Sequence, residues 1–336
     1  MRVTGGSDLA RMQALQKQAL ATRNRLDTAA TEMTTNLKAS RFEATGGNLT
    51  RLFALERSLD RNKVFTDNIT LTELRLEVTQ GTLGQILAPL QDLSIDMIDA
   101  TSRADYSTAM LHATTARSEF ATTVGLLNGQ VAGQSLFAGT TTDSPALAPA
   151  NAMLADLDAL AAGAADSTAA IAAIDAYFAK PAGAFYPSGY IGSADDLTPV
   201  EIGEGQRLDY GMRADQDELV AVLRSQAMAA VVAGGAFAGN QAEQMAMLTD
   251  SGNRLLAAKE GILDLRAAVG SQQEVVERAK AQRVSEYDTL DLARSKIMTT
   301  DPLEAASAYQ ALEVQLESIF TVTARLANLR FVNYMR

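Results

Sequence analysis

The sequence predicts a mainly α-helical protein. In it, long antiparallel helices from the N- and C-terminal regions form a coiled-coil-like rod, and a small α+β insertion domain occupies the middle of the chain. Three observations support this fold class. Both ends carry apolar residues at alternating spacings of three and four. Only 7 of 336 residues are Pro, 5% are aromatic and none is Trp. Near residue 141 the pattern changes from helical periodicity to short, Gly-rich runs.

The C-terminal segment begins with a strong helix start. Asp301 can cap the helix, Pro302 suits its first position and Glu304 favours its first turn. A helix of about 30 residues would extend roughly 45 Å. Its apolar seam has polar residues at two positions and comprises Leu312, Leu316, Ile319, Thr323, Leu326 and Arg330. A helix with such a stripe needs a partner.

Residues 7–40 carry a matching seam, formed by Met12, Ala19, Leu26, Ala30, Met33 and Leu37. The remaining positions of this repeat, Gln16 and Arg23, are polar and would set the register of assembly. Gly46 and Gly47 end the first helix, and Asn48 or Thr50 can cap the next one. The residues that we expect to form the assembly seam are Met12, Leu26, Met33, Leu37, Leu312, Leu316, Ile319 and Leu326.

Between these ends, helical patterns cover residues 49–100, 106–131 and 218–298. Glycines and one proline within them predict interruptions. We expect a kink or turn at Gly81, Gly84 and Pro89. In the last segment, breaks are expected at Gly234, Gly235, Gly239, Gly252, Gly261 and Gly270.

The insertion covers residues 141–222. A linker-like stretch, TTDSPALAPA, leads into one Ala-rich helix. Apolar Val200 and Ile202 then alternate with Glu201 and Gly203, which indicates small strands. Residues 151–220 hold twelve Asp and Glu against three Lys and Arg, so this part is solvated and acidic.

The chain therefore divides into three predicted domains. Residues 1–44 with 300–336 form a terminal coiled-coil domain, residues 45–140 with 223–299 form a helical rod domain, and residues 141–222 form the outward-facing acidic insertion.

Composition excludes several functions. The absence of Cys removes disulfides, thiolate metal sites and a Cys nucleophile. The single histidine, His112, cannot build a multi-His zinc site and is expected to be an ordinary helical residue. A net charge of −11 argues against nucleic acid as a partner. We expect no membrane span, no cleavable signal peptide and no cofactor.

An enzymatic alternative rests on the acidic insertion. Asp195 with Asp196, and Glu201 with Glu204, are its carboxylate clusters, and a hydrolase or binding module would have to use them. Neighbouring acids in Gly-rich loops are far more often solvated surface. The glycine-rich GGAFAG at residues 234–239 lacks the Lys-Ser/Thr of a phosphate-binding loop. We therefore expect no enzyme.

Two segments resemble a known family. Residues 266–335 contain RAAVGS, then Ser295-Lys296-Ile297, an acidic break at Asp301 and a terminal heptad helix, and this order is similar to the C-terminal pattern of bacterial flagellins. The segment GQSLFAGTTTD, residues 133–143, and the opening MRVT resemble the hook–filament junction branch of that family. The Asp-Asp-Pro-Ala-like motif usual in the family is replaced by FEATGGNLTRL at residues 42–52.

The resemblance implies a structural subunit that connects hook to filament in the bacterial flagellum. Its partners would be hook-associated protein 1, flagellin and further copies of itself in a ring, with a possible export chaperone on the C-terminal helix. It would be extracellular, exported unfolded through the flagellar type III apparatus. The alternative within the family is a filament-forming flagellin, which typically has a different N-terminal start. Seam residues can be buried only on assembly, so we expect the termini to be disordered in the free monomer.

Overall fold

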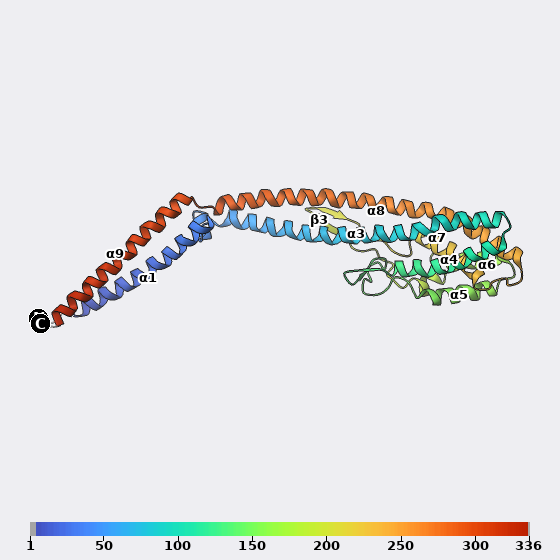
Figure 1. Cartoon of the computed structure of the whole chain (residues 1–336), viewed down its shortest axis with the longest axis horizontal. Helices are drawn as coiled ribbons and strands as arrows, with labels where there is room; N and C mark the ends of the chain where they lie inside the picture. Colours follow the sequence, from blue (N-terminus) through green and yellow to red (C-terminus); the bar gives the residue numbers. More distant parts are fainter. Residues whose placement is uncertain (1–4, 335–336) are drawn as a thin grey trace. The chain divides into compact units, whose positions relative to one another are not determined.

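The computed structural model describes residues 5–334, and the side chains of residues 10–326 (Figure 1). Two compact units make up the chain, and each is described by itself. The first unit contains Met1–Lys63 and Val284–Arg336, and the second contains Val64–Arg283. Both ends of the chain therefore belong to one unit, as a rod built from terminal helices requires. The predicted division into three domains remains a prediction.

Helices dominate the described chain, which confirms the mainly α fold class. They are α1 (Gly5–Thr35), α2 (Arg41–Ala44), α3 (Thr50–Ser102), α4 (Tyr106–Leu127), α5 (Ala150–Ala162), α6 (Ser167–Tyr177), the π-helix η1 (Phe185–Gly189), α7 (Asp217–Ala233), α8 (Gln241–Met298) and α9 (Pro302–Tyr334). Two antiparallel hairpins pair β1 (Gln130–Val131) with β2 (Gln134–Ser135) and β3 (Val200–Gly203) with β4 (Gln206–Leu208). Gly205 lies between β3 and β4 with a φ of +68°, a conformation that favours glycine.

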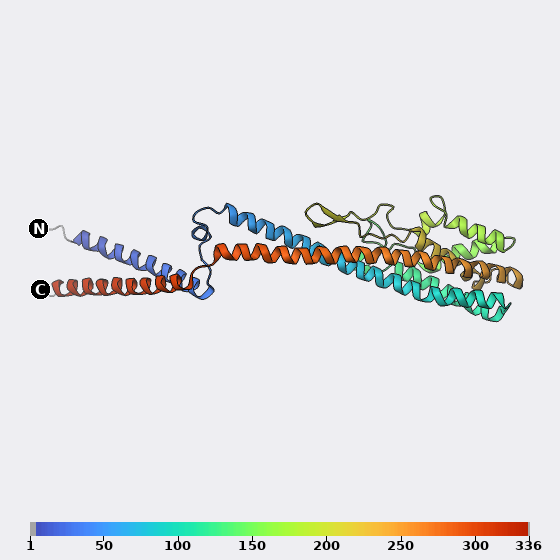
Figure 2. The same ribbon diagram turned by 90° about the horizontal axis from the view of Figure 1, so that it is seen from above.

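In the first unit, α1 and α9 pack against each other (Figures 1 and 2). Their inner ends are joined by backbone hydrogen bonds. The Lys38 amide donates to the Met298 carbonyl over 2.7 Å, and the Thr300 amide donates to the Asn36 carbonyl over 3.1 Å. Leu37 and Thr299 form an antiparallel bridge between these bonds. The two helices are therefore an antiparallel hairpin with a fixed register at this end.

In the second unit, α3 and α8 also run antiparallel. Lys280 Nζ donates to both carboxylate oxygens of Glu73, at 2.9 and 2.7 Å, and the Arg283 guanidinium lies 5.8 Å from the centre of the Phe65 ring. Side chains spaced by seven residues line both helices and are buried: Ile69, Leu76, Leu83, Leu90 and Met97 on α3, and Leu255, Ile262, Val269 and Val276 on α8. This seven-residue spacing is the pattern of a coiled coil.

The predicted turn at Gly81, Gly84 and Pro89 is wrong, because α3 continues through all three residues. Pro89 cannot donate the amide hydrogen bond of its turn. The buried neighbours Leu83 and Leu90 hold the helix together across that loss.

The predicted breaks at Gly252, Gly261 and Gly270 are also wrong, since all three lie inside α8. The first two mark close helix packing instead. A Cβ atom on Gly252 would lie 3.0 Å from Ile98, and one on Gly261 would lie 3.1 Å from Glu218. The break between α7 and α8 occurs as predicted, and Gly235 and Gly239 have φ values of +102° and +88° there.

The segment between α4 and α7 packs into the core of the second unit. Its Ala-rich region forms two helices rather than the single one expected, because Asp166 caps α6 by accepting from the Ala169 amide at 2.8 Å. The buried guanidinium of Arg75 on α3 donates to the Ser135 and Leu136 carbonyls, both at 2.8 Å. The β3–β4 hairpin is attached to the same unit, since Asn68 Nδ2 donates to the Glu201 carbonyl at 2.9 Å.

Candidate assembly interface

The seam between α1 and α9 is the predicted functional site. Its positions alternate at spacings of three and four on both helices and are buried or half-buried. They are Met12, Leu15, Ala19, Thr22, Leu26 and Ala29 on α1, and Ala305, Tyr309, Leu312, Leu316, Ile319, Thr323 and Leu326 on α9. Five of these thirteen residues are Ala or Thr, and the other eight are large and apolar or aromatic. Only Thr22, Ala29, Ala305 and Ile319 are buried, so most of the seam remains partly exposed in the single chain.

On α9 the predicted residues lie where the seam lies. Ile319 is buried, and Leu312, Leu316 and Leu326 are half-buried. Thr323 shares this face and satisfies its hydroxyl by donating to the Ile319 carbonyl at 2.7 Å. The side chain of Arg330 lies outside the described residues.

On α1 only part of the predicted seam faces α9. Met12 and Leu26 are half-buried, but Met33 and Leu37 are 40% and 43% exposed. Gln16 and Arg23 are exposed, and the seam uses the residue before each of them. Leu15, three residues after Met12, is the sequence feature that marks the observed seam. The seam continues through Ala19, Thr22 and Ala29, whose small or polar side chains do not stand out as an apolar repeat.

Three helix caps and one further side-chain bond lie near the inner ends of these helices. Asp301 Oδ1 accepts from the Leu303 amide at 2.8 Å, as its position before Pro302 predicted. Asn48 Oδ1 accepts from the Thr50 amide at 3.0 Å and caps α3. The Ser40 hydroxyl accepts from the Glu43 amide at 3.3 Å, and Glu32 Oε1 accepts from the Ala39 amide at 2.8 Å. Both chain breaks are thus locally stabilised and held at one level of the hairpin.

Large apolar side chains also cover the outside of α9. Leu303 is 79% exposed and Val314 65%, and both project from the side of α9 away from the seam. Val322, one residue before the seam residue Thr323, and Phe320, one residue after Ile319, are exposed on the two flanks of the helix. Helix α9 therefore exposes large apolar side chains that α1 does not cover.

The two units differ strongly in charge. Residues 1–63 with 284–336 hold 16 basic and 13 acidic residues, whereas residues 64–283 hold 13 basic and 27 acidic residues. The acidic excess of the chain is confined to the second unit. Apolar exposure on a nearly neutral unit favours association with other proteins.

The acidic clusters in the insertion hold its loops together. Asp196 accepts from Arg213 at 2.9 Å, and the same guanidinium donates from Nε to the buried Asp215 at 2.7 Å. These contacts raise the pKa of Arg213, chiefly through its hydrogen bonds to Asp215. The exposed side chain of Glu201 lies opposite Arg207 in the β3–β4 hairpin. The contacts of Arg213 with Asp196 and Asp215 therefore connect the loops of the insertion.

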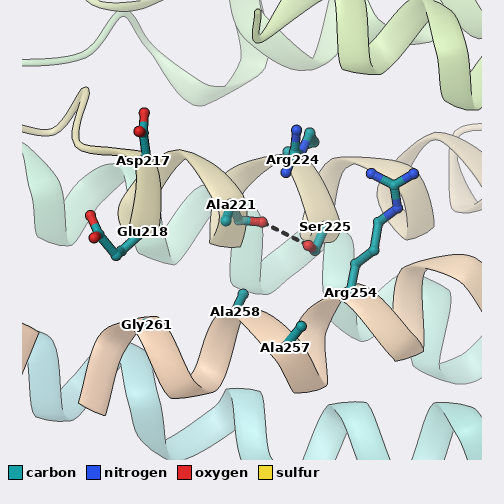
Figure 3. A pocket seen from close by; sticks show the side chains of 9 residues that line it. All are labelled: Asp217, Glu218, Ala221, Arg224, Ser225, Arg254, Ala257, Ala258 and Gly261. Carbon is teal, nitrogen blue, oxygen red and sulfur yellow. Dashed lines mark hydrogen bonds between the residues drawn. The ribbon is translucent and has the colours of Figure 1, made fainter. Parts of the chain in front are cut away.

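A depression of about 330 Å³ lies between α7 and α8 (Figure 3). Ala257, Ala258 and Gly261 on α8 form one wall, and Arg224 and Arg254 lie at one end. The guanidinium of Arg254 donates to both carboxylate oxygens of Asp175, at 2.9 and 3.2 Å.

Ser225 and Arg224, which line this depression, both contact other groups of the chain. The Ser225 hydroxyl donates to the Ala221 carbonyl at 2.6 Å, and Arg224 Nε lies 3.6 Å from the same Asp175. His112 is half-buried on α4, as an ordinary helical residue would be. Among residues 5–334, no three His, Asp or Glu side chains are grouped for a metal ion, and none of the helices is both long and apolar enough to cross a membrane.

The chain is thus a mainly α protein in which helices from the two terminal regions form one unit, and the sequence between them contains further helices and two short hairpins. The chain is similar to the crystal structure of Bacillus cereus FlgL, with 15% sequence identity and a TM-score of 0.51 over 72% of this chain and 100% of that one. It is also similar to a putative flagellar hook-associated protein from Vibrio parahaemolyticus, with 15% identity and a TM-score of 0.49 over 73% of this chain and 95% of that one. Neither a family model nor a curated protein matches the sequence.

The resemblance inferred from the sequence is therefore confirmed at the level of the fold. The FlgL chain is matched over its whole length, which corresponds to 72% of this chain.

Proposed function

We propose that this chain is a structural subunit of the bacterial flagellum, the junction protein that connects hook to filament. It assembles by pairing α1 with α9 and then covering the outer faces of this hairpin with neighbouring subunits. The exposure of the large apolar side chains Leu303, Val314 and Val322 on α9 is the observation that supports this function.

The energetics favour assembly-coupled ordering. Burying a Val or Leu side chain contributes about 1.5 to 3 kcal/mol. Ordering the backbone costs about 1 to 2 kcal/mol per residue. Because most residues of the α1–α9 seam are only half-buried in the single chain, the hairpin gains further stability when neighbouring subunits cover it. We therefore expect both terminal segments to be disordered before assembly and to become helical in the assembled flagellum.

The expected partners follow from the FlgL-like fold and from the exposed apolar side chains of α9. Further copies of the chain would complete a ring, with hook-associated protein 1 on one side and flagellin on the other. An export chaperone would cover the apolar face of α9 before secretion, and the protein would then be extracellular. In this role the acidic insertion faces outward, and the chain has neither enzymatic activity nor a cofactor.

A filament-forming flagellin is the second candidate, because it would use the same terminal pairing. The sequence feature against it, the opening Met1 to Thr4, lies outside the described residues. The two candidates differ in where the protein accumulates. A junction protein occupies one short zone, whereas a flagellin fills the filament.

Deletion of the gene in its native host tests the proposal. We expect electron microscopy to show complete but bare hooks, and immunoblots to show flagellin lost to the medium. Complementation with the unaltered gene is the control and should restore filaments. Intact filaments in the deletion strain would refute a junction role.

A further inference from the structure

Two charged stripes flank the seam of the α1–α9 hairpin. On α1, the exposed residues Arg11, Ala14, Gln18, Ala21 and Arg25 each precede a seam residue by one position. On α9, the exposed residues Gln310, Glu313, Glu317, Phe320 and Ala324 each follow a seam residue by one position. We call the first set the basic stripe and the second the acidic stripe. Both repeat at spacings of three and four, so each forms a continuous line along its helix.

The stripes lie on opposite faces of the hairpin. Successive residues of an α-helix are rotated by roughly 100° about its axis. The basic stripe is offset from the seam by one residue backwards, and the acidic stripe by one residue forwards. Because α1 and α9 run antiparallel, these opposite offsets carry the two stripes to opposite faces.

Their charges are not neutralised within the chain. Arg11, Arg25, Glu313 and Glu317 are exposed, and none of them forms an ion pair with another residue in the described part of the chain. Lys17, at the edge of the basic stripe, is also exposed and has no such pair. The basic stripe therefore carries only positive charges and the acidic stripe only negative ones, and Arg23, one residue after Thr22, lies on the face of the acidic stripe.

Basic and acidic residues of the two stripes also lie at similar distances along the hairpin from its inner end. The bridge between Leu37 and Thr299 marks a common level on the two helices. At 1.5 Å per residue, Arg25 lies about 18 Å from this bridge along α1 and Glu313 lies about 21 Å from it along α9. By the same measure, Lys17 and Glu317 lie about 30 and 27 Å from it.

We propose, on the basis of the proposed function, that a second copy of this chain occupies the basic stripe and places its acidic stripe there at the same height. Arg25 of one copy then pairs with Glu313 of the next, and Lys17 pairs with Glu317. Opposite charges on opposite faces make this contact head-to-tail around a ring, because each copy offers both complementary surfaces. Exposed Phe320 adds an apolar contact within the acidic stripe. Charge complementarity of this kind fixes orientation and register more than affinity.

Charge reversal in the deletion strain tests the contact. We expect R25E and E313R each to reduce the amount of protein on isolated flagella by about tenfold or more, since like charges then face each other. The double variant R25E/E313R should restore it, because every copy then carries the exchanged pair. R103E is the control: Arg103 is exposed just after α3 in the second unit and undergoes the same change of charge away from both stripes, and it should leave the amount unchanged. Equal effects of R25E and R103E, or no recovery in the double variant, would overturn the proposed contact.

Cross-linking tests the geometry directly, because the natural chain has no Cys. A strain that carries Arg25→Cys and Glu313→Cys on two differently tagged copies should yield cross-linked heterodimers in isolated flagella. Strains with either variant alone should yield none. Homodimers through position 25 would overturn the head-to-tail arrangement. Protein present on flagella without any cross-link would refute this contact alone, whereas protein absent from flagella in every strain, including one with the unaltered chain, would refute the proposed function itself.

Discussion

Val314 and Leu316 are two residues apart on α9 but project to opposite sides, so the outer face of the hairpin and its seam can be altered separately. Val314 is 65% exposed, whereas Leu316 is half-buried in the seam with α1. Replacing Val314 by Asp should leave the far-ultraviolet circular dichroism of the monomer unchanged, because no contact within the chain depends on it. The same variant should fail to assemble.

The magnitude follows from the area that Val314 exposes. Burial of a Val-sized side chain contributes about 1.5 kcal/mol at the lower end of the range. A loss of about 1.4 kcal/mol reduces an association constant tenfold. An unpaired carboxylate in the same contact increases the loss. We therefore expect the amount of Val314→Asp protein retained on isolated flagella to fall at least tenfold, as measured by quantitative immunoblot against the unaltered chain.

Gln315→Asp is the matched control for this prediction. Gln315 is exposed next to Val314, so the variant introduces the same carboxylate without removing an apolar side chain. It should assemble nearly as well as the unaltered chain. Equal retention of the Val314→Asp and Gln315→Asp proteins would refute the role of the apolar Val314 side chain in assembly.

Three further predictions concern the seam and the second unit. Leu316→Asp should abolish assembly while changing the circular dichroism of the monomer little, because the termini are expected to be disordered before assembly; a large loss of helix would contradict that expectation. Arg117 donates two hydrogen bonds to Asp158, at 2.9 and 2.7 Å, and Arg117→Ala should lower the free energy of unfolding by about 1 to 2 kcal/mol and with it the melting temperature. Arg103→Ala, which removes an exposed ion pair, should leave the melting temperature unchanged. Equal melting temperatures of the two variants would argue against the contribution of the Arg117–Asp158 contact. Burial raises the pKa of Tyr186 from its ordinary value of 10 to about 12, so the folded state holds this proton longer than the unfolded state, and the free energy of unfolding should fall as pH rises from 10 to 12. Denaturant titrations should show a smaller decline in Tyr186→Phe, and an unchanged decline would show that the hydroxyl is not buried.

Local patterns predicted much of the helical architecture. The cap at Asp301, the break at residues 234–239 and the seam positions of α9 all depend on neighbours close in sequence. Such features can be read from spacing and turn chemistry alone. The seam on α1 could be predicted only in part, because Thr22 and Ala29 occupy buried positions that no apolar pattern marks.

Other features depend on contacts between distant segments and could not be predicted. The continuity of α3 through Pro89 depends on burial against neighbouring helices. Gly252 is required by the approach of Ile98 from another helix, at 3.0 Å from its would-be Cβ atom. Residues of the insertion are likewise buried in the core of the second unit, including Phe185, Ile202 and Met212. Composition alone does not indicate these buried contacts.

The position of the protein in the cell tests the central claim most directly. Thr168 is exposed on α6, and Thr168→Cys would be the single thiol of the chain, so a membrane-impermeant maleimide dye would label it on living cells. The junction role predicts one fluorescent spot at the base of each filament, with no label in a strain that carries the unaltered chain. Label along the entire filament would identify a flagellin-type subunit instead, and label away from flagella would contradict the proposed function.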